Sequence, residues 1–311
     1  MMLAAALAVA GCGSASGVDP GGGPSPHAWS YPEHQYVADE VTLPLTEELS
    51  DKFAFDLDGN GTGDNRLGEM FVVLANSMGG KTPQDSVNGA LGAGRLILLL
   101  ALFARDLRDE SSSNLWQFQG LPMDPPGQPT VGVALEVDPA GPGDAYSGGR
   151  IRAGVGAFGG DDATFRIDLP LADNASMTLP LKAARVEFTT SNDGDTLETG
   201  RAGGAITLDD LNASVIPAMT DVLNDELTRK CAVTATDECA CEGGSGAEKI
   251  HDIFDSAPAD CVVSVDEVQS NSLLHSYLTG DVTLADGTRA LSLAFGFHAV
   301  RATFDHPSPP Q

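Results

Sequence analysis

The chain has 311 residues, of which 42% are hydrophobic, so it can bury a sizeable core in one large domain or two smaller ones. Its 17 Lys and Arg residues stand against 44 Asp and Glu residues, which gives a net charge of −27. This balance excludes a nucleic-acid binder held by phosphate contacts and argues against electrostatic docking onto anionic lipid. The sequence contains no apolar run of the roughly 18 residues that a membrane-spanning helix requires.

The first twelve residues predict export. Residues 1–10 are apolar, and Cys12 follows the tripeptide Val-Ala-Gly. This pattern resembles the lipobox of bacterial lipoproteins, which implies a signal peptide over residues 1–11 and a lipid-modified Cys12. The pattern departs from a usual signal in one respect, since no basic residue precedes the apolar run. The alternative is an ordinary apolar N-terminus that contains a cysteine by chance.

Residues 12–27 have almost nothing to bury, because Gly, Ser and Pro dominate the segment. We therefore expect a flexible tether between the lipid anchor and a folded body. In the lipoprotein pattern, an Asp directly after the modified cysteine retains the protein at the inner membrane. Gly13 and Ser14 stand there instead. The resemblance thus implies an outer-membrane lipoprotein that faces the periplasm or the cell surface.

The folded body is expected over residues 28–305, and its first part, residues 31–49, is mixed and either extended or irregular. Helical spacing of apolar residues then predicts a helix over residues 65–78 that two glycines end. A second short helix is expected over residues 83–91, with Pro in its first turn. Residues 95–104 form an apolar run without polar alternation. They are a buried strand or a core helix, and the glycines before them favour a strand.

An Asp-rich loop over residues 56–65 is the sharpest motif of the chain. Oxygen-bearing side chains stand at loop positions one, three, five and nine, with Gly at six, which resembles an EF-hand-type or thrombospondin-repeat-type calcium loop. Ca²⁺ takes six to eight oxygens, and alternate residues of a turning loop can point inward. The predicted ligands are the loop carboxylates, two further loop residues and one glutamate beyond position twelve: Asp56, Asp58, Asn60, Thr62 (through its carbonyl), Asp64 and Glu69.

The loop departs from the EF-hand pattern at position twelve, where Leu67 replaces the bidentate Glu. Glu69 lies two residues further on and is the candidate substitute. We therefore expect a weak, structural Ca²⁺ site rather than a sensor. The alternative is a solvated turn of Asp, Asn and Gly that caps the following helix.

Residues 55–68, FDLDGNGTGDNRLG, are similar to a signature near the start of predicted lipoproteins of myxobacterial type. Residues 291–304, LSLAFGFHAVRATF, resemble the end of the same proteins. The resemblance covers most of the chain after the tether. It implies a place in the cell envelope and no particular activity.

Between residues 130 and 207 the pattern changes to short apolar runs bounded by turn-forming residues, which is typical of strands. Residues 192–195, Asn-Asp-Gly-Asp, are typical of a hairpin turn between two of them. The expected strands lie at residues 131–137, 150–158, 164–169, 183–190 and 201–207. Asp209 is then expected to cap a helix that reaches Leu223 or beyond, with Pro217 kinking or splitting it.

Four cysteines lie in the segment 228–262: Cys231, Cys239, Cys241 and Cys261. An even number of clustered cysteines in an exported chain predicts two disulfides. Because Cys239 and Cys241 would close a very tight ring, we expect Cys231 to pair with one of them and Cys261 with the other. The alternative is a four-thiolate zinc site, but the spacing lacks the usual pair of short cysteine motifs.

The C-terminal part predicts a Gly-rich loop at residues 242–246, a helix at residues 265–278 and a hairpin formed by residues 281–284 and 289–297. An Asp-Gly pair at the hairpin tip favours a type I′ turn. A Pro-rich tail follows at residues 306–311. Together these elements predict an α+β fold: a mainly antiparallel β-sheet, as a sandwich or a partly wrapped sheet, with a few flanking helices.

The sequence gives no complete catalytic motif. Residues 154–159 match G-x-G-x-x-G but lie in a strand-like run and precede no helix, so we reject a dinucleotide site. The run Gly80-Lys81-Thr82 lacks the first glycine of a phosphate loop and is rejected too. His298 follows an apolar strand and is interpreted as a core or edge residue rather than a base.

We therefore interpret the chain as a cell-envelope lipoprotein with a structural or binding role. The membrane would be its partner through the lipid anchor, Ca²⁺ its cofactor, and an unidentified apolar or surface ligand a further partner. Two alternatives stay open. One is an exported hydrolase acting on polysaccharide or peptide, and the other is a calcium-dependent adhesion module.

Overall fold

The computed structural model describes residues 24–77, 82–141, 145–170, 176–235, 238–256, 259–275 and 277–308. The expected signal peptide (residues 1–11), Cys12 and most of the expected tether lie outside this range, as do residues 78–81 and the end of the tail. The last residues of the expected tether are held in place: Ser25 exchanges two hydrogen bonds of 2.9 Å with the side chain of Asn114.

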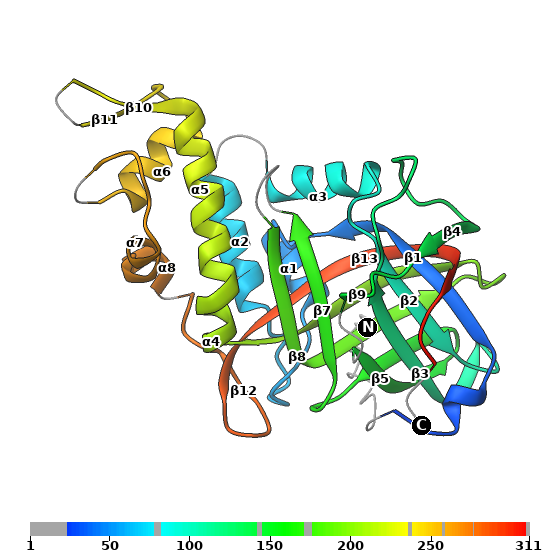
Figure 1. Ribbon diagram of the computed structural model, residues 1–311. Coiled ribbons are helices and arrows are strands. Elements are labelled where there is room, and N and C mark those ends of the chain that lie inside the picture. The colour runs from blue at the N-terminus through cyan, green and yellow to red at the C-terminus, as the bar shows by residue number, and fades with distance from the viewer. Residues whose placement is uncertain are drawn as a thin grey trace, which may run out of the picture.

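Antiparallel β-structure dominates the described chain, and most helices gather along one side of it (Figure 1). The α+β class, mainly antiparallel β, is therefore confirmed. The strands are β1 (Glu33–Thr42), β2 (Leu98–Phe103), β3 (Asp109–Gln119), β4 (Val133–Glu136), β5 (Tyr146–Arg152), β6 (Val155–Gly159), β7 (Thr164–Pro170), β8 (Ser176–Thr190), β9 (Thr196–Thr207), β10 (Cys231–Val233), β11 (Cys239–Cys241), β12 (Val282–Thr283) and β13 (Arg289–Asp305).

Among the described helices, none is long and apolar enough to cross a membrane. The helical elements are the 3₁₀ turn η1 (Ala28–Ser30), α1 (Glu47–Phe53), α2 (Arg66–Ser77), α3 (Pro83–Gly92), α4 (Leu208–Asp210), the π-helical turn η2 (Leu211–Val215), α5 (Ile216–Lys230), α6 (Gly246–Phe254), α7 (Val265–Ser270) and α8 (Ser272–His275).

Eight strands close into a ring. Strand β1 pairs with β2 along one edge and with β13 along the other, so that Tyr36 lies opposite both Leu100 and Arg301. The order around the ring is β1, β2, β3, β5, β6, β8, β9 and β13, and every neighbouring pair is antiparallel. Strands β4, β7 and β12 pair outside this ring. Of the two predicted forms the sheet takes the wrapped one, and the wrap is complete.

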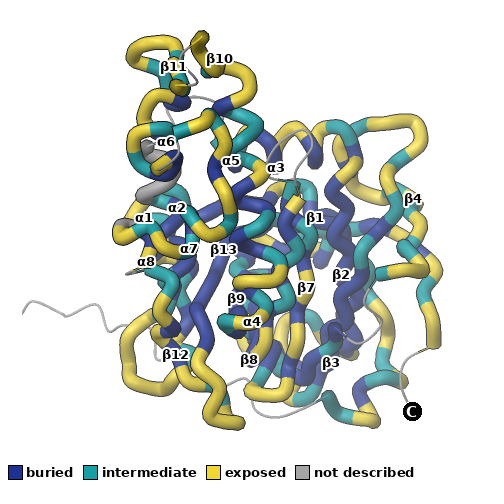
Figure 2. The backbone as a smooth tube through the Cα atoms, turned by 60° about the vertical axis from the view of Figure 1, so that its left-hand side comes forward, coloured by how far each residue is buried: buried dark blue, intermediate teal, exposed yellow. Residues whose placement is uncertain are grey.

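The interior of the ring is a packed core. Large side chains fill it, and Tyr36 donates its buried hydroxyl to the carbonyl of Gly194 at 2.9 Å. Helices α2 and α5 contribute Leu67 and Leu223 to the same cluster, so the sheet and the helices share one core (Figure 2). Each ring strand contributes a buried side chain: Tyr36, Leu100, Leu115, Ile151, Phe158, Phe188, Leu197 and Phe295.

A second buried cluster covers the outer face of β2 and β3. Leu99 of β2 and Trp116 of β3 belong to it, and Trp29 of η1 and Leu135 of β4 pack against it. Strand β2 is therefore buried on both faces, which explains why residues 95–104 show no polar alternation. The preference for a strand over a core helix in this run is confirmed.

Several sequence predictions need correction. The expected strand at residues 150–158 is two strands, because Ala153 (φ 51°) and Gly154 (φ 80°) form a tight turn between β5 and β6. The tip of the last hairpin is not a type I′ turn, since Gly287 alone there has positive φ (85°), as in a three-residue loop with a left-handed glycine. The expected helix at residues 265–278 is two short helices separated at Asn271.

The long helix after β9 begins earlier than predicted. Thr207, rather than Asp209, is the N-cap, and its hydroxyl accepts the backbone N–H of Asp210 at 3.1 Å. Pro217 lies in the first turn of α5, directly after η2, so the helical run changes register at the proline. Residues 31–49, expected to be extended or irregular, contain strand β1, but helix α1 begins at Glu47 and was not predicted. The sequence pattern also did not predict β3, β10, β11 or α6.

Candidate functional site

The Asp-rich loop is closed at its base by its own backbone. Phe55 and Asp64 form an isolated antiparallel bridge, and the N–H of Asp64 donates to the carbonyl of Phe55 at 2.7 Å. Gly59 (φ 76°) and Gly61 (φ 86°) take left-handed conformations that side chains with a Cβ rarely adopt. These glycines allow the chain to reverse twice within the loop.

Three of the predicted ligands come together. Carboxylate oxygens of Asp56, Asp58 and Asp64 lie within 4.8 Å of one another. Burial is the main cause that raises the pKa of Asp64 to about 6, and the negative charges of Asp58 and Asp281 raise it further. The N–H of Leu57, which donates to Asp64 at 2.7 Å, opposes this shift. A cation among these carboxylates would favour their charged forms.

The other predicted ligands are placed differently. Asn60 accepts the N–H of Thr62 through its Oδ1 at 2.7 Å, and both residues belong to the same exposed loop. Glu69 lies on the exposed side of α2, where it pairs with Arg66 at 2.8 Å. The group of three convergent carboxylates does not include Glu69. The structure thus brings together the three Asp carboxylates of the predicted set and not Glu69.

The second half of the signature fixes the loop to the sheet. Asn65 is buried, and its side-chain amide donates to the carbonyls of Ser50 and Ala294 and accepts the N–H of Ala294. A Cβ on Gly68 would lie 2.4 Å from Oδ1 of Asn65, so Gly68 makes room for this side chain. Sequence reasoning missed Asn65, although its position directly after Asp64 in the signature was visible.

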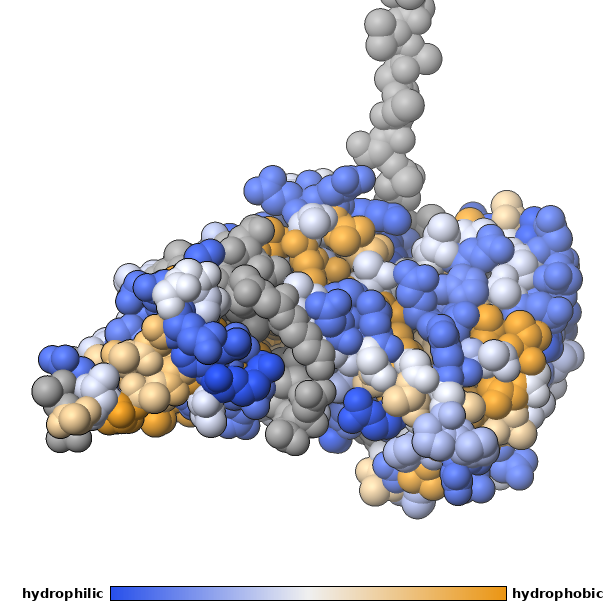
Figure 3. Space-filling model, turned by 90° about the horizontal axis from the view of Figure 1, so that it is seen from above, coloured by the Kyte–Doolittle hydropathy of each residue, from blue (hydrophilic) through white to orange (hydrophobic). Residues whose placement is uncertain are grey.

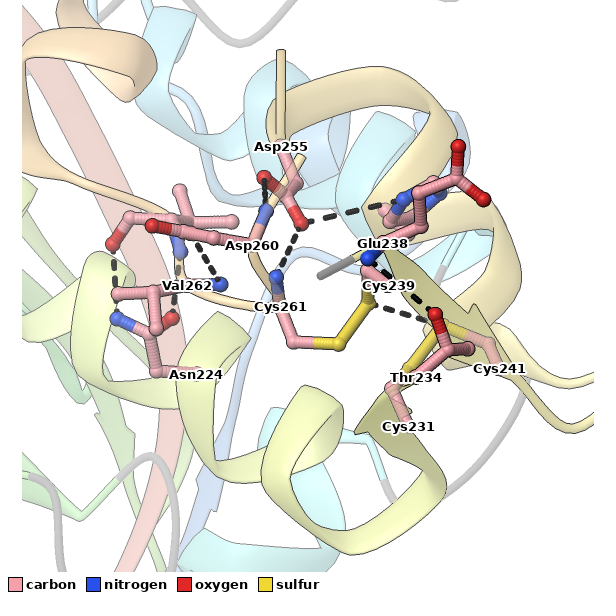
Figure 4. Close-up of a disulfide and its surroundings, with 12 residues drawn as sticks. Asn224, Cys231, Thr234, Glu238, Cys239, Cys241, Asp255, Asp260, Cys261 and Val262 are labelled. Atoms are coloured by element: carbon pink, nitrogen blue, oxygen red, sulfur yellow. Dashed lines mark hydrogen bonds and ion pairs between the residues drawn. A yellow bond between two sulfur atoms is a disulfide. The ribbon is translucent and has the colours of Figure 1, made fainter. Parts of the chain in front are cut away.

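The cysteines form two disulfides. Cys231 bonds to Cys241, which lies directly opposite it in the β10–β11 hairpin, and Cys239 bonds to Cys261 (Figure 4). The expectation that Cys231 and Cys261 each pair with one residue of the Cys-x-Cys motif is therefore confirmed. All four sulfurs are bonded in pairs, so the oxidised protein offers no set of four thiolates to zinc.

The loop that carries Cys261 is held by two side chains from helices. Asp255, at the end of α6, accepts the N–H groups of Asp260 and Cys261 at 3.2 and 2.8 Å. The side-chain amide of Asn224, on α5, donates to the carbonyl of Val263 and accepts its N–H. Figure 4 shows both side chains directed at this loop. The position of Cys261 is thus set by hydrogen bonds as well as by its disulfide.

A histidine–carboxylate pair lies on the ring where two strands bulge. Asp39 is the extra residue of a bulge in β1, and His298 lies at a bulge in the pairing of β13 with β9. The Nδ1 of His298 and Oδ1 of Asp39 are 2.6 Å apart, and both side chains are partly exposed. The expectation of a core or edge residue is therefore wrong: His298 is partly exposed on a strand that is paired on both sides, and it has a carboxylate partner. Sequence reasoning missed Asp39.

Two surface hollows flank this pair. The larger, of about 550 Å³, lies between β1 and α3 and includes Asp39, and the smaller, of about 230 Å³, includes His298. Glu40 and Thr42 line both. Bulges often lie next to active sites, because they redirect side chains from the sheet.

Seen from above, hydrophobic residues form separate patches between hydrophilic ones (Figure 3).

The motifs rejected from sequence lie in two places. Residues 154–159 span the β5–β6 turn and β6, in a hairpin rather than a strand followed by a helix. Gly80 and Lys81 lie outside the described residues.

Comparison of the chain with protein-family models, with curated proteins and with solved structures finds no match.

Proposed function

We propose that this protein is an exported, lipid-anchored protein of the cell envelope with a structural or binding role, whose fold is stabilised by Ca²⁺. The observation that carries the proposal is the pair of disulfides in the segment 231–261. Disulfides persist in oxidising compartments and are rare in the cytosol. Export agrees with the apolar N-terminus, and Cys12 would carry the anchor.

The calcium part of the proposal is supported by the convergence of Asp56, Asp58 and Asp64. Two carboxylates of the loop are exposed, and the third is half-buried with a raised pKa. Bound Ca²⁺ would offset the repulsion among them, and the carbonyl of Thr62 and water would complete its shell of six to eight oxygens. Because Glu69 is paired with Arg66, the site is expected to bind weakly, as extracellular structural sites do.

Lipidation is tested by expressing the full chain in a bacterium fed a clickable fatty acid. The account predicts that the wild-type protein takes up the label and sediments with membranes. Cys12→Ser should lose both properties, whereas Ser14→Ala, a matched change in the tether, should keep both. An unlabelled, freely soluble wild-type protein would contradict the anchor.

A second candidate function, an exported hydrolase, is favoured by the contact between His298 and Asp39 beside two hollows. A carboxylate that orients an imidazole is a common arrangement for general base catalysis. Screening of the full chain against glycan and peptide substrates tests it. Activity that His298→Gln removes would support a hydrolase, and no turnover by the wild-type protein would reject it for those substrates.

A further inference from the structure

We propose that the Cys239–Cys261 disulfide is a thiol–disulfide exchange site for a low-molecular-weight thiol, with Sγ of Cys261 as the atom that is attacked. The proposal concerns a part of the molecule remote in sequence from the Asp-rich loop, and it does not depend on calcium. It rests on the arrangement of the four sulfurs and of two side chains from α6.

The two bridges are in contact through the Cys-x-Cys motif. The Sγ atoms of Cys239 and Cys241, which belong to different disulfides, lie 4.0 Å apart. Sγ of Cys231 lies within 4.8 Å of both. All four cysteines are partly exposed. Strands β10 and β11, which carry three of them, project from the helical side (Figure 2). An external thiol can thus reach the bridges.

His251 stands beside Cys239. A ring nitrogen of His251, the Sγ of Cys239 and a carboxylate oxygen of Asp255 lie within 4.8 Å of one another. The Nε2 of His251 is buried and makes no hydrogen bond among the described residues, although it lies 3.9 Å from Oδ2 of Asp255. In the disulfide, the sulfur of Cys239 carries neither a proton nor a charge, so it forms no strong hydrogen bond or ion pair with the imidazole. Reduction of the Cys239–Cys261 bridge would give Cys239 a thiol or thiolate that can form one.

Asp255 determines how these groups are placed. Its side chain is fully buried and accepts the N–H groups of Asp260 and Cys261. His251 precedes it by one helical turn on α6, so both side chains lie on the same face. Asp255 thus positions the Cys261 loop, and it lies beside the imidazole of His251.

These positions define a balanced exchange. The external thiolate attacks Sγ of Cys261, the Cys239–Cys261 bond breaks, and its electron pair leaves with Cys239 as a thiolate beside His251. A thiolate leaves faster when a neighbouring imidazole can donate a hydrogen bond to it, and His251 lies beside Cys239, which favours attack on Cys261 over attack on Cys239.

The thiolate of Cys239 then takes a proton from water. One thiol and one disulfide enter, and a mixed disulfide at Cys261 and a thiol on Cys239 result. The Cys231–Cys241 bridge stays intact, because a Cys239–Cys241 bond would close a very tight ring.

The test treats the full-length oxidised protein with a limiting amount of glutathione, blocks free thiols with an alkylating agent and maps all bonds by mass spectrometry. We expect glutathione on Cys261, the alkyl group on Cys239 and an intact Cys231–Cys241 bond. The double variant Cys231→Ala/Cys241→Ala should give the same products at Cys261 and Cys239. Glutathione found first on Cys231, Cys239 or Cys241 would overturn the proposal.

The variant His251→Gln tests the role of the imidazole in the exchange. The variant should slow the attack on Cys261 about tenfold, because the leaving thiolate of Cys239 loses its neighbouring imidazole. His275→Gln, an exposed histidine of the same helical side, is the matched control and should leave the rate unchanged. Melting temperatures of both variants establish that the fold is intact. A rate in His251→Gln equal to that of the wild type would reject the role of the imidazole.

Discussion

Asn65 binds both backbone polar groups of Ala294: its Oδ1 accepts the N–H at 2.8 Å, and its Nδ2 donates to the carbonyl at 3.2 Å. The two residues are 229 positions apart in the sequence, and this contact joins the Asp-rich loop to strand β13. The N–H and the carbonyl of Ala294 point away from the neighbouring strands, and the side chain of Asn65 forms a hydrogen bond with each of them.

Asn65→Ala should therefore destabilise the protein strongly. The change leaves the buried N–H and carbonyl of Ala294 without this partner, at a cost of about 2–4 kcal/mol. Denaturant unfolding of the full chain in a chelator measures the loss. Asn60→Ala, in the exposed part of the same loop, is the matched control and should cost less than about 0.5 kcal/mol. Equal losses in the two variants would contradict the structural role of Asn65.

Asp64 gives the calcium-free protein a distinctive pH dependence. Its folded-state pKa of about 6 lies above the ordinary value of 3.8, so the folded state binds more protons between these values. The stability that Asp64 contributes is therefore full at low pH and is lost as the pH rises through about 6. Melting in chelator from pH 4 to 7.5 should show this loss in the wild-type protein. Asp64→Asn should remove that component, and an unchanged profile in this variant would refute the assignment.

Removal of the Cys239–Cys261 bridge should affect the helical side of the molecule more than the ring. The bridge holds the loop after α6 to the β10–β11 hairpin, and the closed loop spans 22 residues. In Cys239→Ala/Cys261→Ala we expect a stability loss of about 2–4 kcal/mol. Hydrogen exchange should increase in α6 and β10–β11 and stay slow in β2 and β3. Equal acceleration in all of these elements would contradict the prediction.

The contact between His298 and Asp39 should hold the imidazole in place beside the two hollows. Asp39→Ala removes the carboxylate that lies 2.6 Å from Nδ1, so the ring should lose its fixed orientation. Nuclear Overhauser contacts of the His298 ring protons measure this change. Glu40→Ala, at a residue that lines both hollows, is the control and should leave these contacts unchanged. Unchanged contacts in Asp39→Ala would contradict the prediction.

Local sequence signals predicted those elements whose pattern is complete within a few residues. The helix at 83–91 and the hairpin turn at 192–195 are examples, since Pro83 and Gly194 provide the required backbone conformations. The wrong prediction of one continuous strand at residues 150–158 also comes from dependence on local residue types. Ala153 takes a positive φ that its residue type does not signal, so the turn at Ala153 and Gly154 was read as continuous strand.

The closure of the ring could not be predicted, because it depends on pairing between β1 and β13, with Tyr36 opposite Arg301. Strand β3 was missed because its first half is polar. Ser113 and Asn114 are nevertheless buried, and Asn114 bonds to Ser25 from the far end of the chain. In the candidate sites, the carboxylates of the loop were visible from their spacing. The partners His251 of Cys239 and Asp39 of His298 come from separate elements and required the fold.

The most direct test of the central claim, that the fold is stabilised by Ca²⁺ at Asp56, Asp58 and Asp64, is a thermal melt of the full chain with calcium and with chelator. At about 100 times the dissociation constant, binding should stabilise the protein by about 2.7 kcal/mol, a rise of several degrees in melting temperature. Asp58→Asn should lose most of this rise, whereas Asp193→Asn, in the exposed turn after β8, should keep it. Equal melting temperatures of the wild-type protein in calcium and in chelator would contradict the claim.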